Sequence, residues 1–208
     1  GGRVEAVGIS RDITKRKASE RHIRYLNSRD ALTGLYNRWH YTQRRDKLNT
    51  KANLPLTLVL IDVNGLKLMN DAFGHLAGDE LLVSFARTLQ DSLRATDIAA
   101  RIGGDEFVLL LPKTGAEAAE IIVERIRSAL SQKTVKNVPI SASFGIATKF
   151  EPGGDFGGVY REAESRMYRE KMILSQQTKA STLKRILSAL YEKCEAERRH
   201  AESVSGLC

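Results

Sequence analysis

The chain has 208 residues, of which 42% are hydrophobic and 28% charged, and these proportions exclude a disordered, collagen-like or low-complexity protein. Lysine and arginine number 33 against 25 acidic residues, so a net charge of +8 permits an anionic partner such as nucleic acid, acidic lipid or a nucleotide. The length suits one compact domain with appendages.

The cysteines fit a reducing compartment, and the apolar stretches argue against a membrane span. Cys194 and Cys208 both fall in the last fifteen residues, where they cannot cross-link a core. The longest apolar stretch, residues 54–61, is far too short to cross a membrane, and the first residues lack the apolar core of a signal peptide. We therefore expect a cytoplasmic protein, or a cytoplasmic piece of one.

The first 29 residues are predicted to precede the main domain. Residues 4–10 alternate like a strand but have no preceding partner to pair with. Residues 15–29 read as a polar helix with a thin apolar seam. Such a seam suits a coiled-coil connector, and a solvated linker helix fits the same stretch equally well.

Between Asp30 and Ser175 the helical and strand patterns alternate. The predicted helices cover residues 37–51, 76–95, 118–130 and 159–174, and the predicted strands cover residues 56–61, 98–102, 107–111 and 139–147. Gly103 and Gly104 tolerate the positive φ of tight turns, so residues 98–111 read as a β-hairpin. This order predicts an α/β fold in which helices pack on a mixed sheet with one antiparallel hairpin.

A last helical pattern covers residues 182–200. Its apolar stripe consists of Leu183, Ile186, Leu187, Leu190 and Cys194. The stripe is expected to pack against its own domain or against a second copy of the chain.

Three carboxylates are candidates for a cation site. Asp62 directly follows the predicted strand 56–61, and Asp105 and Glu106 lie in the hairpin turn. Each has an ordinary explanation, because charged residues often end strands and Gly and Asp are common in turns. If the strand neighbours the hairpin, the three carboxylates converge at one sheet edge, where a hard divalent cation such as Mg²⁺ would offset their repulsion.

Further residues extend this edge into a possible nucleotide site. Lys67, expected in a loop, and the backbone N–H groups of Gly103 and Gly104 are suited to holding phosphates. Asn70 and Asp79 can read a base, and a carboxylate prefers guanine because guanine offers N1–H and N2–H₂ donors. Seen alone, both are ordinary helix-cap or surface residues, and Asp79 would also suit the first turn of a helix.

Four blocks of sequence resemble those of GGDEF domains, the diguanylate cyclases. They read DALTGLYNR at residues 30–38, DVNGLKLMNDAFGHLAGD at 62–79, RIGGDEF at 101–107 and SFGIA at 143–147. The resemblance covers roughly residues 28–175. It implies the nucleotidyl-cyclase-like α/β fold and a reaction that condenses two GTP into cyclic di-GMP with release of two pyrophosphates.

The resemblance also assigns roles to matching positions. The implied ligands of Mg²⁺ or Mn²⁺ are Asp62, the Val63 carbonyl, Asp105 and Glu106. Asp105 is also the candidate base for the 3′-hydroxyl, so the catalytic set is Asp105, Glu106 and Lys67. The implied substrate contacts are Asn70 and Asp79 at guanine and Lys67, Lys171, Gly103 and Gly104 at the phosphates, with His75 as a further substrate-binding residue.

The resemblance also implies a homodimer, because the family site holds one GTP per domain while each new phosphodiester bond joins two. It implies a product site as well. Arg94 and Asp97 form an Arg-x-x-Asp sequence nine residues before Gly103, at the offset of the family's site for inhibition by cyclic di-GMP. Without the resemblance, an Arg and an Asp three apart at a helix end would be a local ion pair. One departure follows Lys171, where ILSQQ at 173–177 replaces the family's Gly-Arg-Asn run and removes any contact from that arginine.

The flanking segments resemble parts of other domains. Residues 1–14 look like the end of a PAS sensor, 15–29 like a signalling helix and 176–208 like the start of an HD-GYP phosphodiesterase domain, around a cyclase domain at 30–175. The alternative function is a regulatory module that binds GTP or cyclic di-GMP without turnover. A nucleic-acid binder is disfavoured because the basic residues are dispersed and no binding motif accompanies them.

Overall fold

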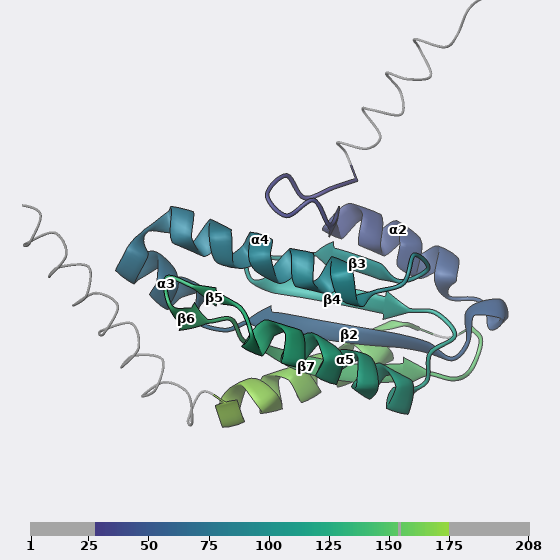
Figure 1. The fold of residues 1–208 in the computed structure, drawn as a ribbon. Coiled ribbons are helices and arrows are strands. Elements are labelled where there is room, and N and C mark those ends of the chain that lie inside the picture. The colour runs from purple at the N-terminus through teal and green to yellow at the C-terminus, as the bar shows by residue number, and fades with distance from the viewer. Residues whose placement is uncertain (1–27, 154, 175–208) are drawn as a thin grey trace, which may run out of the picture.

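A five-stranded sheet between two helical layers forms the body of the computed structural model, which describes residues 28–153 and 155–174 (Figure 1). The strands, in the spatial order β1-β3-β4-β2-β7, are β1 (Tyr36–Asn37), β3 (Ile98–Arg101), β4 (Glu106–Leu111), β2 (Leu56–Val63) and β7 (Ala142–Lys149). β1 is parallel to β3, and the other neighbours are antiparallel. A separate ribbon pairs β5 (Thr134–Val135) with β6 (Val138–Pro139).

Helices cover both faces of this sheet. They are α2 (Arg38–Leu48), α3 (Leu66–Phe73), α4 (His75–Ser92), α5 (Ala116–Ser131), a 3₁₀ turn (Lys51–Asn53) and a helix over residues 157–174, which we call the 157–174 helix. The predicted α/β fold with helices on a mixed sheet and one antiparallel hairpin is therefore confirmed, and each predicted helix of the sheet domain is present with ends shifted by a few residues.

The central strand β2 sends alternate side chains to two cores because successive residues of a strand point to opposite faces. Val59 and Ile61 join the core under α4 and α5, which includes Phe85 of α4. Leu58 and Leu60 join the core under α2 and the 157–174 helix. All eight residues of β2 are buried, which explains why this strand reads as an unbroken apolar run.

Gly145 lets the 157–174 helix lie directly on β7. A Cβ at this position would collide with the Ala163 carbonyl oxygen and would lie 2.5 Å from the Met167 backbone nitrogen. The helix backbone therefore approaches the strand more closely than any side chain at residue 145 would allow.

Three local predictions were wrong. Asp62 lies inside β2 rather than after it, because its backbone continues the ladders to both β4 and β7. Lys67 lies in α3 rather than in a loop; α3 has only eight residues, too few for a clear helical period, and begins after Gly65 with φ of 76°. The strand predicted at 139–147 is β7, which begins at Ala142 after the β5–β6 ribbon.

Several predictions fall wholly or largely outside the described residues. These are the strand at 4–10, the helix at 182–200, and the PAS-like and HD-GYP-like ends. Of the helix predicted at 15–29, only Ser28 and Arg29 are described, and Arg29 forms an isolated bridge with Tyr36 instead of a helical turn.

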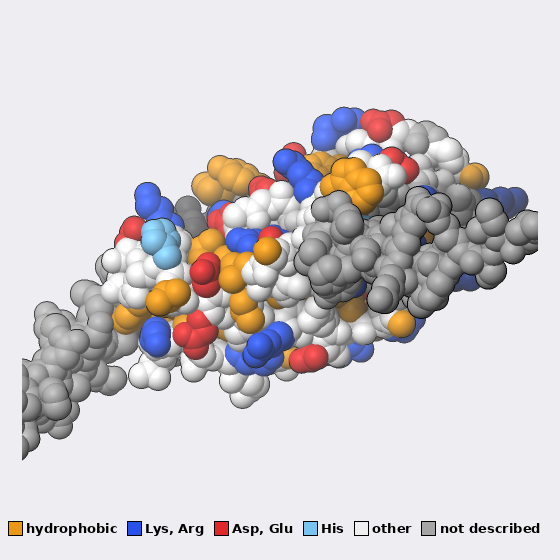
Figure 2. All heavy atoms as spheres, turned by 90° about the horizontal axis from the view of Figure 1, so that it is seen from above, with side chains coloured by type: hydrophobic (Ala, Val, Ile, Leu, Met, Phe, Trp, Pro, Cys, Tyr) orange, Lys and Arg blue, Asp and Glu red, His pale blue; other side chains and the backbone are white. Residues whose placement is uncertain are grey.

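Within residues 28–153 and 155–174, no helix combines the length and apolarity that a membrane crossing requires. On the face seen in Figure 2, basic and acidic side chains are interspersed with apolar ones.

Candidate active site

The structure brings the three predicted carboxylates to one end of the sheet. Asp62 is paired with Glu106 across the β2–β4 ladder, and the Val63 N–H donates to the Asp105 carbonyl oxygen at 2.9 Å. Asp62 is buried, Asp105 is half-buried and Glu106 is exposed. The antiparallel pairing of β2 with the hairpin thus places these residues together although they are more than 40 positions apart.

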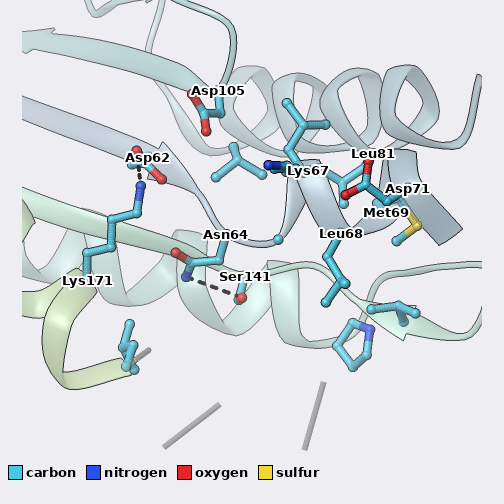
Figure 3. A pocket seen from close by; sticks show the side chains of 16 residues that line it. Asp62, Asn64, Lys67, Leu68, Met69, Asp71, Leu81, Asp105, Ser141 and Lys171 are labelled. Carbon is cyan, nitrogen blue, oxygen red and sulfur yellow. Dashed lines mark hydrogen bonds and ion pairs between the residues drawn. The ribbon is translucent and has the colours of Figure 1, made fainter. Parts of the chain in front are cut away.

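Lys171 of the 157–174 helix reaches the carboxylate of Asp62 (Figure 3). Its Nζ donates to Asp62 Oδ2 at 2.7 Å, while Oδ1 is buried without a hydrogen-bond partner. Burial raises the pKa of Asp62, the bond from Lys171 opposes that shift, and the negative charge of Asp105 adds to it. The site therefore holds a carboxylate with one unsatisfied oxygen beside a cation.

The Asp62–Lys171 pair lies in the wall between two cavities. One cavity of about 420 Å³ is also lined by Lys67, Asp105 and apolar residues of α3, as Figure 3 shows. The other, of about 480 Å³, is also lined by Glu106 and by polar residues of the 157–174 helix, namely Arg161, Glu164, Ser165 and Tyr168. Both cavities therefore open onto the same ion pair.

The backbone angles of the two glycines in the hairpin turn differ from the sequence prediction. Neither Gly103 nor Gly104 is among the described glycines with positive φ. Gly103 lies close to the Glu106 side chain, since a Cβ at residue 103 would lie 2.5 Å from Glu106 Oε2, and that exposed carboxylate would have to move to accommodate it. The turn closes through a 2.9 Å bond from the Ile102 N–H to the Glu106 carbonyl oxygen.

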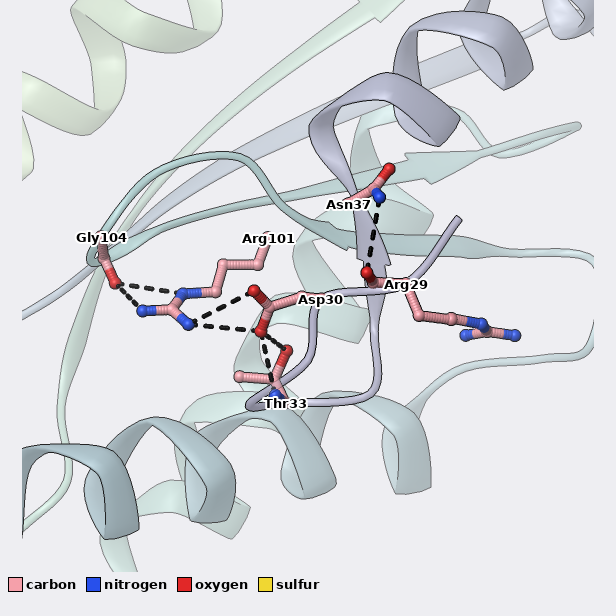
Figure 4. Close-up of polar contacts among 6 residues, drawn as sticks. All are labelled: Arg29, Asp30, Thr33, Asn37, Arg101 and Gly104. Carbon is pink, nitrogen blue, oxygen red and sulfur yellow. Dashed lines mark hydrogen bonds and ion pairs between the residues drawn. The ribbon is translucent and has the colours of Figure 1, made fainter. Parts of the chain in front are cut away.

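A cluster of polar contacts that sequence reasoning did not assign supports this turn (Figure 4). Arg101 Nη2 donates to the Gly104 carbonyl oxygen at 2.7 Å, and its Nη1 donates to Asp30 Oδ1 at 3.2 Å. Asp30 also accepts bonds from the Thr33 backbone N–H at 2.9 Å and the Thr33 hydroxyl at 2.6 Å. The available signal was that both charged residues belong to the sequence blocks at 30–38 and 101–107.

The predicted base-reading residues lie on α3 and α4, and neither lines the two cavities. Asn70 Oδ1 is buried without a hydrogen-bond partner, and a Cβ at Gly78 would collide with it, so this glycine makes room for the amide. The next residue, Asp79, is exposed in the second turn of α4 rather than the first. His75 is exposed at the start of α4, in the first turn.

The donor set fits a hard divalent cation in its chemistry. Asp62, Asp105 and Glu106 supply carboxylate oxygens, the ligands that Mg²⁺ prefers, and Asp62 Oδ1 is buried and unpaired. Within the described residues, however, no three His, Cys, Asp or Glu side chains are gathered closely enough to hold a metal ion. The fit therefore rests on the identity of the donors and on the free oxygen of Asp62.

Arg94 and Asp97 lie at the opposite end of the sheet, just before β3. The Asp97 carboxylate accepts the Arg94 backbone N–H at 2.9 Å, so it closes a local turn. The exposed Arg94 side chain lines a cavity of about 400 Å³ together with Arg44 and Lys113. Since β2 rises about 3.3 Å per residue, the two ends of the sheet are roughly 20 Å apart.

Comparison with known proteins places this fold and site in a family. Residues 27–197 match the family described as diguanylate cyclase, GGDEF domain, which is most of the chain. The chain belongs to this family, whose defining Gly-Gly-Asp-Glu-Phe sequence is the hairpin turn described above.

Relatives in sequence and in structure agree with this assignment. The diguanylate cyclase DgcM of Escherichia coli K12 is 34% identical over 167 residues, which cover 78% of this chain and 40% of DgcM. The diguanylate cyclase SiaD of Pseudomonas aeruginosa, solved with its activator SiaC, has a TM-score of 0.66 at 28% identity, covering 77% of this chain and 65% of that one. The GGDEF domain of DgcB from Caulobacter crescentus, solved with c-di-GMP, has a TM-score of 0.65 at 27% identity, covering 70% and 90%. The chain thus spans less than half the length of DgcM.

Proposed function

We propose that this domain is a diguanylate cyclase that condenses two GTP molecules into cyclic di-GMP and releases two pyrophosphates. The observation that carries the proposal is the convergence of Asp62, Asp105 and Glu106 with Lys171 at one end of the sheet, beside a cavity that Lys67 also lines. Carboxylates that hold a cation, next to lysines that offset phosphate charge, are what phosphoryl transfer from a nucleoside triphosphate requires.

In this proposal α3 and α4 select the base. The carbonyl oxygen of Asn70 is buried and has no partner, and it would gain a hydrogen bond from a donor on a base if the side chain rotated out of its buried position. Asp79 follows Gly78, the glycine that accommodates the Asn70 amide, so both groups belong to one junction between the helices. A carboxylate and an amide oxygen together accept the N1–H and N2–H₂ donors of guanine, which adenine lacks.

The chemistry is divided among the carboxylates and the lysines. Asp62, the Val63 carbonyl, Asp105 and Glu106 would hold Mg²⁺ or Mn²⁺, which when bound polarises the α-phosphate and lowers the pKa of the attacking hydroxyl. Asp105 would accept the proton of the 3′-hydroxyl. Lys67, Lys171 and the backbone N–H group of Gly104 would hold the phosphates and offset the charge that develops on pyrophosphate. The Gly103 N–H could join them only by leaving the Glu106 carbonyl oxygen, to which it donates at 3.3 Å.

Turnover requires two domains, because each would hold one GTP while every new phosphodiester bond joins two. The 3′-hydroxyl on one domain must come within about 3–3.5 Å of the α-phosphate on the other. We therefore infer that a homodimer is the active form. By the same proposal, the cavity at Arg94 would bind the product cyclic di-GMP, with Asp97 fixing the local turn.

The proposed setting is a cytoplasmic sensory protein. GTP is the substrate, so the domain would act where GTP is available. Residues 1–14 would end a PAS-like sensor, 15–29 would connect it to the cyclase domain at 30–175, and 176–208 would begin an HD-GYP-like domain. These assignments rest on sequence resemblance alone.

A binding module without turnover is the second candidate function. The observation that favours it is that no three metal-ligating side chains are gathered within the described residues. Such a module would bind GTP or cyclic di-GMP and would transmit that binding to an attached domain.

One assay separates the two functions. The purified chain is incubated with GTP and Mg²⁺, and the nucleotides are resolved by chromatography while pyrophosphate is measured. A cyclase yields cyclic di-GMP and two pyrophosphates for each product molecule, and Asp105→Ala or Glu106→Ala abolishes the product while circular dichroism shows a folded protein. GTP binding without product at any protein concentration establishes the binding module instead.

A further inference from the structure

Arg127 of α5 lies between two elements that carry parts of the site. Its Nη2 donates to Glu170 Oε2 at 2.7 Å, and its Nε forms an ion pair with Glu124 Oε1 at 3.2 Å. The same guanidinium lies 4.5 Å from the centre of the Phe144 ring, in cation–π contact. Arg127 therefore joins α5, β7 and the 157–174 helix through one planar group.

Two partners of Arg127, Phe144 and Glu170, are neighbours of the Asp62–Lys171 pair. Phe144 is buried in β7 and is paired with Ile61, the residue before Asp62. Glu170 directly precedes Lys171. The guanidinium thus contacts Phe144, which is paired with the residue before Asp62, and Glu170, the residue before Lys171.

Lys171 depends on such support because of its own chemistry. A lysine side chain has a flexible four-carbon stem, so the position of its ammonium depends on how firmly the backbone at that residue is held. The Lys171 side chain is 41% exposed, and its helix continues with exposed residues at 172 and 173. Glu170 is more enclosed, with 24% of its side chain exposed and Oε1 buried without a hydrogen-bond partner, so its bond to Arg127 holds this turn in place.

We propose that Arg127 is a positioning residue for Lys171. By binding Glu170 while it stacks on Phe144, it fixes the turn of the 157–174 helix from which the ammonium reaches the metal and phosphate end of the site. This inference rests on the proposed function, in which Lys171 contacts the phosphates of GTP. Arg127 itself touches no proposed substrate or metal group.

A double-mutant cycle between Arg127→Ala and Lys171→Ala tests the inference. In the wild-type background, Arg127→Ala is expected to lower kcat/KM for GTP three- to tenfold, and Lys171→Ala to lower it more. In the Lys171→Ala background, adding Arg127→Ala is expected to change kcat/KM less than twofold, because the group that it positions is gone. Arg127→Lys should recover only part of the activity, since an ammonium does not provide the planar fork that binds Glu170 and stacks on Phe144.

Arg166→Ala is the matched control. Arg166 ties the same helix to the same strand through a 2.9 Å bond to the Ile146 carbonyl oxygen, and it pairs with Glu162 at 2.6 Å. It lies five positions from Lys171 and holds neither of its neighbours. We expect Arg166→Ala to change kcat/KM less than twofold. Melting temperatures of all variants report any general loss of structure.

The outcomes separate this inference from the proposed function. If the loss of kcat/KM in the double variant equals the product of the two single losses, Arg127 acts independently of Lys171 and the positioning role is overturned. An equal loss from Arg166→Ala would show a general structural role and overturn it as well. Unchanged kcat/KM in Lys171→Ala overturns the role of Lys171, although a wild-type chain that makes cyclic di-GMP is still a cyclase. If the wild-type chain makes no product, cyclase function fails, and the same cycle measured as the Kd for GTP by calorimetry decides the positioning role.

Discussion

Arg101 and Asp30 form an ion pair across 71 positions of sequence, with 3.2 Å between Nη1 and Oδ1. The two side chains are 15% and 24% exposed, so the pair is shielded from solvent more than a surface ion pair is. The other side of the guanidinium holds the Gly104 carbonyl oxygen. The segment that enters the domain is therefore connected through one arginine to the turn that carries Asp105.

Asp30→Asn is expected to lower the free energy of unfolding by about 1–3 kcal/mol at pH 7, as loss of a charge-assisted contact does. Burial acts to raise the pKa of Asp30, but the bonds from Thr33 and Arg101 outweigh burial and lower it below the usual 3.8. The carboxylate form is thus the one that stabilises the fold. Its contribution is present above the usual pKa and is lost as the pH falls through the lowered pKa.

Urea unfolding at pH 7 and near pH 2.5 measures this dependence. The stability difference between wild type and Asp30→Asn should shrink at the lower pH. Asp46→Asn, which removes an exposed pair with the adjacent Arg45, serves as control with an effect within about 0.5 kcal/mol. An equal effect of the two substitutions at pH 7 contradicts the role given to Asp30.

The layers of the fold were predictable from sequence because periodicity records which faces are buried. The apolar run of β2 and the helical spacing of α4 and α5 each have enough residues to reveal a period. The eight residues of α3 are too few, which is why Lys67 was expected in a loop.

The side-chain contacts of the site were not predictable in the same way. The carboxylates could be gathered from motif spacing, but the bond from Lys171 to Asp62 joins residues 109 positions apart and depends on how a helix crosses the sheet. The close approach of the Glu106 side chain to Gly103 was also hidden, because it depends on how the turn folds. Such approach distances are set by tertiary packing.

Base selectivity should reside in Asp79. Replacement by Asn removes the charge that accepts the guanine donors, so Asp79→Asn is expected to weaken GTP binding about 10- to 100-fold, as charged hydrogen bonds do. Binding of ATP should be weak for wild type and unaffected by the substitution. Calorimetric titration with both nucleotides measures this, and equal affinity of the wild-type chain for ATP and GTP would contradict the assignment of Asn70 and Asp79.

Inhibition by product should depend on Arg94. Arg94→Ala is expected to relieve inhibition by added cyclic di-GMP while leaving the initial rate within about twofold, because residue 94 and the carboxylates are at opposite ends of the sheet. Arg94→Lys should behave similarly, since an ammonium lacks the two-pronged contacts of a guanidinium. Progress curves with and without cyclic di-GMP test this. An uninhibited wild-type enzyme refutes a product site.

Stability should decrease as the pH falls below 6.5 because of His40. Burial lowers the pKa of His40 from its usual 6.5, and the charges of Arg44, Arg29 and Lys47 lower it further. The unfolded chain then binds a proton that the folded chain resists, so stability is lost from pH 6.5 downwards, through the lowered pKa.

Denaturant unfolding between pH 7.5 and about pH 5 tests the histidine. His40→Gln should flatten the pH dependence, although it also removes the stacking of the imidazole on Tyr36 at 4.0 Å between ring centres. His75→Gln is the control because His75 is exposed. A pH dependence that survives in His40→Gln but disappears in His75→Gln would assign the effect to His75 and contradict the role given to His40.

Specific activity should rise with protein concentration. The helix that the sequence predicts at residues 15–29 would be short and would have few apolar seam positions, which is marginal for dimerisation, so we expect a monomer or a weak dimer. Fusing a strong parallel coiled coil in register before Lys15 should raise activity at low concentration. Assays over a dilution series, combined with light scattering, measure both properties. Flat specific activity from a monomeric chain contradicts a mechanism that needs two domains.

Gly145 has a consequence for how the site can be tuned. The missing side chain at this strand position permits the close spacing between β7 and the 157–174 helix, the helix whose Lys171 contacts Asp62. A methyl group at residue 145 would collide with the Ala163 carbonyl oxygen and crowd the Met167 backbone nitrogen, so the helix and the strand would have to move apart. The distance between the sheet that carries Asp62 and the helix that carries Lys171 is therefore limited at a position that belongs to neither residue.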